Sequence, residues 1–161
     1  MRIHSLITRL TLGALLAASS AITLPALAAE NPFQGSRVAI ESGKSFDDVT
    51  KAVKGLVAKN GMMVMAEVDQ GKMLSMAGLR LKATLFLVGN PTVGKQLFEQ
   101  DHAVGLYIPL RIFVYTAANG ITFVEYDKPS TLLSQFRDEK IGMVAKMLDE
   151  KIEGLATMAA R

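Results

Sequence analysis

The sequence contains no cysteine and no tryptophan, and it has only two histidines in 161 residues. Without cysteine the chain can form no disulfide, supply no thiolate nucleophile and hold no Cys-ligated zinc or iron–sulfur cluster. His102 is the only histidine after residue 28, whereas a histidine-based metal cluster needs three or four ligands. A Ser–His–Asp triad has little room for the same reason. We therefore predict no catalytic residue, no metal ligand and no cofactor.

Residues 1–28 have the three-part pattern of a cleaved secretory signal peptide. Arg2 and Arg9 form a basic start, an apolar run follows over 10–24, and the segment 25–28 (PALA) ends in an Ala-x-Ala cleavage pattern. The apolar run of about 15 residues is shorter than the roughly 20 that a spanning helix needs. This favours cleavage over an uncleaved anchor. We expect a periplasmic protein that has no membrane partner after cleavage.

The basic character of the chain is partly a property of this leader. Removing residues 1–28 takes away Arg2 and Arg9 but no acidic side chain, so the formal net charge falls from +3 to +1. Nucleic-acid binding requires a clustered basic face, and no nucleic-acid partner is expected. The roughly 133 residues that remain suit a single domain with an ordinary hydrophobic core.

Hydrophobic periodicity after the leader predicts a two-layer α+β sandwich, with helices on one face of a mixed, largely antiparallel sheet of about five strands. Residues 29–36 are expected to form a loose lead-in, 37–136 the α+β domain, and 137–161 a C-terminal helix. The predicted elements in order are a strand over 37–41, a helix from Ser45 to Asn60, a strand over 62–69, a short helical turn over 70–78, a strand over 83–88, a helix from Pro91 to about Asp101, strands over 111–116 and 121–127, and a helical tail from Pro129.

Three of these elements carry specific local expectations. Alternation along 62–69 (MMVMAEVD) places Met63, Met65, Glu67 and Asp69 on one face of the strand. The Asn119–Gly120 pair is a strong hairpin signal. In the C-terminal helix, apolar residues recur at steps of four and three, so this helix either lies across the sheet or also meets a symmetry mate. The residues of this seam are Ile141, Ala145, Leu148, Ile152, Leu155 and Ala159.

The central segment resembles the bacterial family called domain of unknown function 302. The matching features are Val88-Gly89-Asn90-Pro91, Gly94, the segment 106–110 (LYIPL), Val114-Tyr115 and the segment 126–129 (YDKP). The resemblance covers roughly residues 38–135. It implies a compact α+β fold, a homodimer and no settled activity.

Two positions depart from the family pattern. Family members often have histidine directly after the position of Asp69 and another in the segment after Pro129. This chain has Gln70 at the first place and Gln135-Phe136 around the second. A haem or metal role that used those imidazoles is therefore not carried over to this chain.

The most promising site lies where the strand ending at Val88 delivers the chain to a helix. Gly89, Asn90 and Pro91 stand at that helix N-terminus, where free N–H groups favour a small anion. Asn90 and Pro91 are also ordinary capping residues. Together with Pro109 and Tyr115, near Tyr107 and Tyr126, they form our predicted ligand-binding cleft.

Two other groups of residues suggest chemistry. Eight methionines follow the leader, and thioethers select Cu(I), although methionines at these spacings are also typical of core filling. The pairs Glu67/Asp69 and Glu125/Asp127 each share a strand face, as an acid–base pair would. We favour the explanation that they are solvated strand ends.

We therefore expect a non-catalytic periplasmic module that binds a small ligand or a partner protein as a homodimer. The alternative is a haem or Cu(I) carrier that uses methionines and His102. A carboxylate-dependent hydrolase is less favoured.

Overall fold

The computed structural model describes residues 36–161, so the expected signal peptide and most of the lead-in lie outside the described residues. The described residues belong to one compact unit. Within them no helix is long and apolar enough to cross a membrane.

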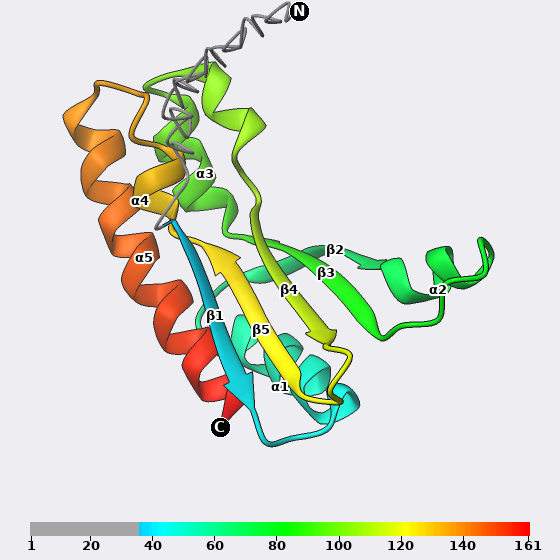
Figure 1. Cartoon of the computed structure of the whole chain (residues 1–161). Helices are drawn as coiled ribbons and strands as arrows, with labels where there is room; N and C mark the ends of the chain where they lie inside the picture. Colours follow the sequence, from blue (N-terminus) through cyan, green and yellow to red (C-terminus); the bar gives the residue numbers. More distant parts are fainter. Residues whose placement is uncertain (1–35) are drawn as a thin grey trace, which may run out of the picture. The chain divides into compact units, whose positions relative to one another are not determined.

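Five strands form one open sheet in the order β1-β5-β4-β3-β2 (Figure 1). Each neighbouring pair of described strands is antiparallel. The antiparallel α+β sandwich is thus confirmed, and no parallel pair occurs in this sheet. The strands are β1 (Arg37–Ser42), β2 (Met63–Asp69), β3 (Ala83–Gly89), β4 (Leu110–Thr116) and β5 (Thr122–Asp127).

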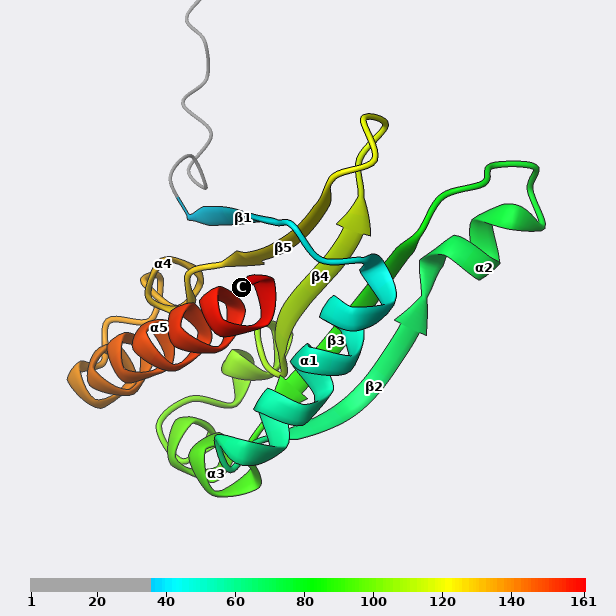
Figure 2. The ribbon, with the colours of Figure 1, turned by 90° about the horizontal axis from the view of Figure 1, so that it is seen from below.

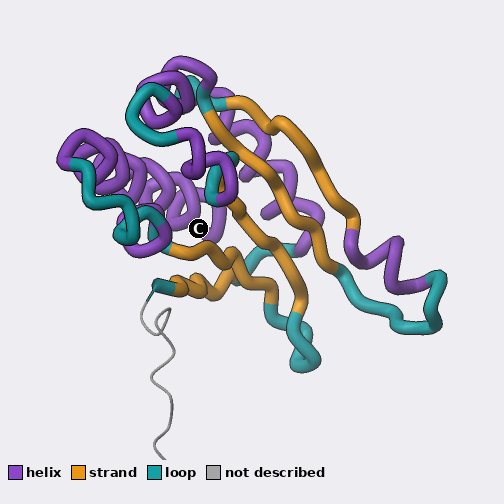
Figure 3. The backbone as a smooth tube through the Cα atoms, turned by 90° about the horizontal axis from the view of Figure 1, so that it is seen from above, coloured by secondary structure: helices purple, strands orange, loops and turns teal. Residues whose placement is uncertain are grey.

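Two long helices, α1 (Phe46–Lys59) and α5 (Glu139–Ala160), cover the same face of the sheet (Figure 2). The short helix α4 (Pro129–Leu132) packs against α5. The helix α3 (Pro91–Phe98) and the 3₁₀-helix η1 (His102–Leu106) follow β3 at one end of the sheet. The short helix α2 (Gln70–Ser75) connects β2 to β3 at the opposite end of these strands (Figure 3).

The first helix has the signals that its sequence predicts. The Ser45 hydroxyl accepts the N–H of Asp48 at 3.2 Å and so caps the helix. At the other end Gly61 adopts a φ of +67°, and the N–H of Met62 bonds to the Val57 carbonyl at 3.0 Å. This is the Schellman pattern, which glycine adopts without strain. The helix therefore stops where Met62 turns back into the core.

The seam of the C-terminal helix lies inside the chain. All six of its residues are buried against the sheet and α1. Because they are covered within one chain, this stripe is not free to meet a symmetry mate. The α5 helix thus closes the core of the domain.

A β-bulge corrects the face assignment of β2. The register shifts between Val64 and Ala66, so Val64 pairs with Val88 while Ala66 pairs with Leu87. The strict alternation predicted for this strand is wrong, because the bulge inserts Met65 and moves the residues after it by one position. Met65 can then lean over the end of β3.

The hairpin between β4 and β5 forms around Asn119 and Gly120 as predicted. The N–H of Gly120 bonds to the Ala117 carbonyl at 2.9 Å, and Gly120 has a φ of +85° while no described non-glycine residue has a positive φ. The connection is therefore a type I turn followed by a left-handed glycine, and not the type I′ turn that would need Asn119 at positive φ.

The second face of the sheet carries no described helix (Figures 2 and 3). Alternation places Leu85, Leu87, Phe113, Tyr115 and Phe123 on this face. Tyr115 stacks between the two phenylalanines with ring centroids 5.1 Å and 5.5 Å away. We call these five residues the open-face cluster.

Candidate ligand-binding pocket

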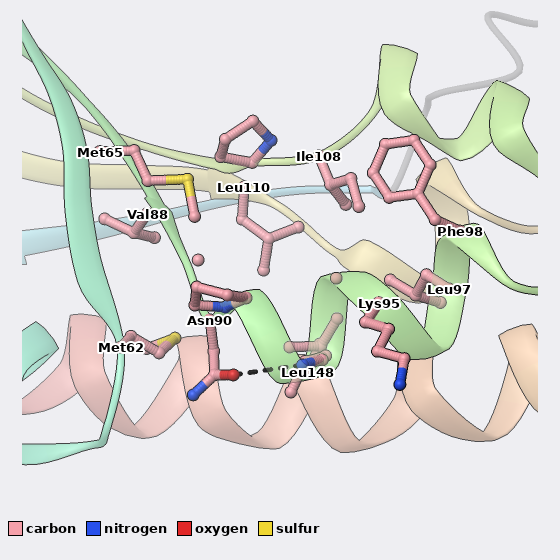
Figure 4. Close-up of a pocket in the computed structure, with 15 residues that line it drawn as sticks. Met62, Met65, Val88, Asn90, Lys95, Leu97, Phe98, Ile108, Leu110 and Leu148 are labelled. Carbon is pink, nitrogen blue, oxygen red and sulfur yellow. Dashed lines mark hydrogen bonds between the residues drawn. The ribbon is translucent and has the colours of Figure 1, made fainter.

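A pocket of about 420 Å³ opens at the end of the sheet where β3 leads into α3 (Figure 4). Its walls come from β2, the end of β3, α3, the segment Ile108–Leu110 and Leu148 of α5. These segments are far apart in sequence. The pocket therefore exists only once the sheet, α3 and α5 are assembled.

The pocket walls are almost entirely apolar. Its deep side is formed by core residues that are buried in the chain, among them Met62, Val88 and Leu148. Its outer side is formed by Met65 and Phe98, which are both partly open to solvent. Such a lining favours a ligand with a large apolar surface.

Close packing around Gly89 shapes one wall. A Cβ atom at Gly89 would lie 3.0 Å from the methyl carbon of Met65 and 3.8 Å from Cβ of Pro109. The absence of a side chain therefore lets Met65 and Pro109 approach each other across the end of β3. The Ile108–Pro109 peptide bond here is cis.

Asn90 organises the helix end beside the pocket. Its side-chain oxygen accepts the N–H groups of Thr92 at 2.8 Å and Val93 at 3.1 Å. Its amide donates to the carbonyl of Gly61 at 2.6 Å, which joins α3 to the turn after α1. The side chain is thus a structural clamp as well as a pocket wall.

These bonds remove the predicted anion site. The N–H of Gly94 bonds to the Asn90 carbonyl at 2.8 Å, and Pro91 has no N–H. Every N–H of the first turn of α3 is therefore either absent or already used within the chain. Lys95 lies beside the pocket, but its amine is 3.5 Å from Glu99. The capping explanation of Asn90 and Pro91 holds, and the pocket favours apolar groups over anions.

Four of the five predicted ligand-binding residues line this pocket: Gly89, Asn90, Pro91 and Pro109. Tyr115 does not, because it projects from the open face near the far end of β4. Burial and a hydrogen bond to the Glu125 carboxylate raise the pKa of Tyr115 above its ordinary value.

The three tyrosines expected near the cleft do not converge. Tyr107 donates from its hydroxyl to the Gln135 side chain at 3.1 Å, and its ring meets Phe136 edge-on at 5.9 Å. Tyr126 is buried on the helix-covered face of β5, whereas Tyr115 lies on the other face of the sheet. Strand register decides which face of the sheet each ring occupies, and register cannot be derived from the residues of one strand alone.

The sequence analysis missed most of the apolar lining. The helical spacing of Val93, Leu97 and Phe98 predicts one apolar face on α3. All three residues line the pocket. Met65 and Leu148 could not be found by pattern, because the first depends on the bulge and the second on the packing of α5.

The residues of the alternative functions lie in different places. His102 is exposed at the start of η1 and does not line the pocket, whereas Met62 and Met65 do. Among residues 36–161, no group of three or more His, Cys, Asp or Glu side chains could hold a metal ion.

Three of the four carboxylates in the two acidic pairs lie in ion pairs. Glu67 lies 3.2 Å from the amine of Lys54, and Arg37 lies 3.1 Å from Glu125 and 3.8 Å from Asp127. Asp69 instead caps the N-terminus of α2. Neither acidic pair lines the pocket described above.

Comparison with protein families identifies the class of this domain. The family model described as "Domain of unknown function DUF302" matches residues 38–159. The chain belongs to this family.

A solved relative has the same fold. The crystal structure of an uncharacterized conserved DUF302 protein from Bacillus stearothermophilus superimposes with a TM-score of 0.72, over 78% of this chain and 98% of that one. The sequence identity is 17%, so this likeness concerns the fold alone.

The curated relatives match this chain over only part of their own length. A segment of 96 residues, 59% of this chain, is 30% identical to the fluoride-specific ion channel FluC 1 of Brucella suis biovar 1 (strain 1330) and to FluC 2 of Brucella melitensis biotype 1 (strain ATCC 23456 / CCUG 17765 / NCTC 10094 / 16M). The match spans only 38% and 36% of those proteins. The similarity therefore concerns a part of each channel protein.

Proposed function

We propose that this chain is a periplasmic, non-catalytic module that binds a small, mostly apolar ligand in the pocket beside α3. The observation that carries the proposal is the pocket itself, which measures about 420 Å³. This volume is within the range of small-molecule sites, which are typically apolar with a few polar groups. Periplasmic location follows from the signal-peptide pattern of residues 1–28.

The bonding around the pocket supports a neutral ligand. The amide of Asn90 already makes three hydrogen bonds within the chain, so it has little capacity left for a ligand. A molecule with strong polar groups would lose its hydration without full replacement of its hydrogen bonds. An apolar molecule incurs no such cost, and it gains by leaving water.

The proposed module is a homodimer that joins through the open-face cluster. A sheet face with five half-buried apolar residues and no covering helix is a natural surface for a second copy. The native mass of the purified protein measures this directly. A Soret band or stoichiometric copper in the same preparation would instead support the carrier alternative.

Gly94 allows a direct test of the pocket. It lines the pocket within α3, and a Cβ atom built there has no neighbour within 4 Å. A leucine at this position would extend into open space, and leucine is also a better helix former than glycine by nearly 1 kcal/mol. Gly94→Leu should therefore reduce the free pocket volume without unfolding the chain.

The experiment is a fluorescence titration with the neutral dye N-phenyl-1-naphthylamine on the chain from Ala29 onward. We expect saturable binding to the wild type and at least a roughly tenfold weaker affinity for Gly94→Leu, which corresponds to about 1.4 kcal/mol. Gly142→Leu is the matched control, because Gly142 is also an exposed helical glycine with no neighbour within 4 Å and does not line the pocket. Equal affinity of both variants for the dye, or no binding by the wild type, would contradict the proposal.

A further inference from the structure

The connection between β2 and β3 projects away from the body of the domain (Figures 1 and 2). It consists of α2 and the loop that follows, residues 70–82, and we call it the α2 arm. Every residue from Lys72 to Lys82 is exposed. The arm is attached at its two ends, where Gly71 is buried and where the Lys82 carbonyl accepts the N–H of Thr116 at 3.0 Å.

The exposed residues of the arm include a dense apolar group. Met76 is 81% exposed, and four other large apolar side chains of the arm are also open to solvent. Exposed apolar groups of this size mark surfaces that interact with something else. The four others are Met73, Leu74, Leu79 and Leu81.

The arm has a defined conformation. The Asp69 carboxylate accepts the N–H of Lys72 at 2.8 Å and caps α2. Gly78 has a φ of +87°, and the N–H of Leu79 bonds back to the Leu74 carbonyl at 3.1 Å, as in a Schellman cap. At the base, a Cβ atom on Gly71 would lie 2.5 Å from the Leu81 carbonyl oxygen. The apolar side chains are therefore presented on a preformed structure, which lowers the entropy lost on binding.

The charge of the arm is of one sign. Residues 70–82 contain Lys72, Arg80 and Lys82 and no acidic residue. Lys82 lies 3.9 Å from Asp47, whereas Lys72 and Arg80 form no ion pair with another described residue. The combination of exposed Met and Leu with adjacent Lys and Arg matches the interface of an anionic lipid bilayer, which offers both an acyl layer and lipid phosphates.

The open face of a second copy fits the arm less well. Its acidic residues Glu125 and Asp127 are already paired with Arg37, and the register places Arg111 on the same face. The register also places Glu41 on this face, so its three carboxylates exceed its two arginines by a single charge. That is a weaker match to the three cations of the arm than an anionic bilayer offers.

We propose that the α2 arm is a peripheral membrane-docking element. Its Met and Leu side chains enter the interfacial layer of an anionic bilayer, and Lys72 and Arg80 contact lipid phosphates. Such binding reaches only about 5–10 Å into the bilayer and needs no spanning helix. The proposal replaces the expectation that the mature chain has no membrane partner, and it is independent of the pocket.

The absence of tryptophan from the chain makes the test specific. In Met76→Trp, all tryptophan emission comes from the tip of the arm. The variant chain from Ala29 onward is mixed with vesicles of phosphatidylcholine containing about 30% phosphatidylglycerol, or with pure phosphatidylcholine. We expect a blue shift with the anionic vesicles, a weaker one with the neutral vesicles, and loss of the shift at high salt.

Met143→Trp is the matched control, because Met143 is 59% exposed on α5, away from the arm. Its emission should not shift. Adding Lys72→Gln and Arg80→Gln to Met76→Trp should weaken vesicle affinity about 25-fold, at about fivefold for each basic residue.

Three results would overturn the proposal. The first is no shift of Met76→Trp on anionic vesicles. The second is an equal shift for the Met143→Trp control. The third is a native mass that falls from dimer to monomer in Met76→Asn, since the arm would then be a contact between two copies of the chain.

Discussion

Replacing Asn90 tests whether one side chain holds the pocket end of the domain together. Its oxygen caps α3 through the N–H groups of Thr92 and Val93, and its amide reaches the Gly61 carbonyl. Asn90→Ala removes all of these bonds. Asn90→Asp keeps an acceptor for the cap but loses the donor to Gly61.

The expected magnitudes follow from these bonds. Loss of an N-cap costs about 1 kcal/mol, and loss of the bond to Gly61 costs about 1 kcal/mol more. Asn90→Ala should therefore lower the free energy of unfolding by about 2 kcal/mol, or the melting temperature by roughly 6–10 °C in a domain of this size. Asn90→Asp should lose about 1 kcal/mol, because the cap and its interaction with the helix dipole remain.

The assay is urea denaturation followed by far-UV circular dichroism, which gives both the midpoint and the slope. Asn60→Ala is the control, because the Asn60 amide donates one bond, at 2.8 Å, to the Leu56 carbonyl of its own helix. Its loss should be smaller than that of Asn90→Ala. The clamp would be refuted if Asn90→Ala stayed within about 0.5 kcal/mol of the wild type, or if Asn90→Asp were the less stable of the two Asn90 variants.

Substitutions at Gly71 and Tyr126 test the packing at the base of the α2 arm and the titration of a buried side chain. Gly71→Ala should lower the free energy of unfolding by about 1–3 kcal/mol, because its methyl group would meet the Leu81 backbone. The control is Gly55→Ala on α1, where a methyl group has no neighbour within 4 Å and the free energy of unfolding should rise by up to about 1 kcal/mol. Equal melting temperatures for the two variants would contradict the close approach at Gly71. Burial, together with the carboxylates of Glu153 and Asp149, raises the pKa of the Tyr126 hydroxyl above 10.0. As pH rises, the hydroxyl therefore loses its proton in the unfolded chain before it does so in the folded chain. The free energy of unfolding then falls as pH rises above 10. Tyr126→Phe should show a shallower fall in urea midpoint between about pH 9 and pH 11, and an unchanged slope would contradict this assignment.

Local backbone chemistry accounts for the part of the fold that could be predicted. Ser45 and Asn90 are predictable as caps because their short polar side chains can satisfy helix N–H groups, and both do so. Gly61 marks a helix end because glycine takes the left-handed conformation freely. Asn90 and Pro91 also indicate where the pocket lies, although the reason for choosing them, free N–H groups for an anion, is not supported by the structure.

The parts that could not be predicted depend on contacts between distant segments. The bulge at Met65 is visible only in the pairing of β2 with β3. Leu148 reaches the pocket because α5 lies across the sheet, 58 positions after Asn90 in the chain. Tyr115 was assigned to the pocket from its neighbourhood in sequence, but the register of β4 places its ring on the opposite face of the sheet.

The first strand and the last helix of this domain are joined to each other, and this affects how the domain folds. Among the described strands β1 pairs only with β5, and the Ser42 hydroxyl at its end donates to the Ala160 carbonyl at 2.6 Å. Until β5 and the end of α5 are in place, β1 therefore has no partner strand in the described sheet and Ser42 lacks this acceptor. Such long-range pairing makes closure of the sheet a late event in folding. A chain that lacks the final turn of α5 should therefore be unable to form the hydrogen bond that joins the end of β1 to this helix.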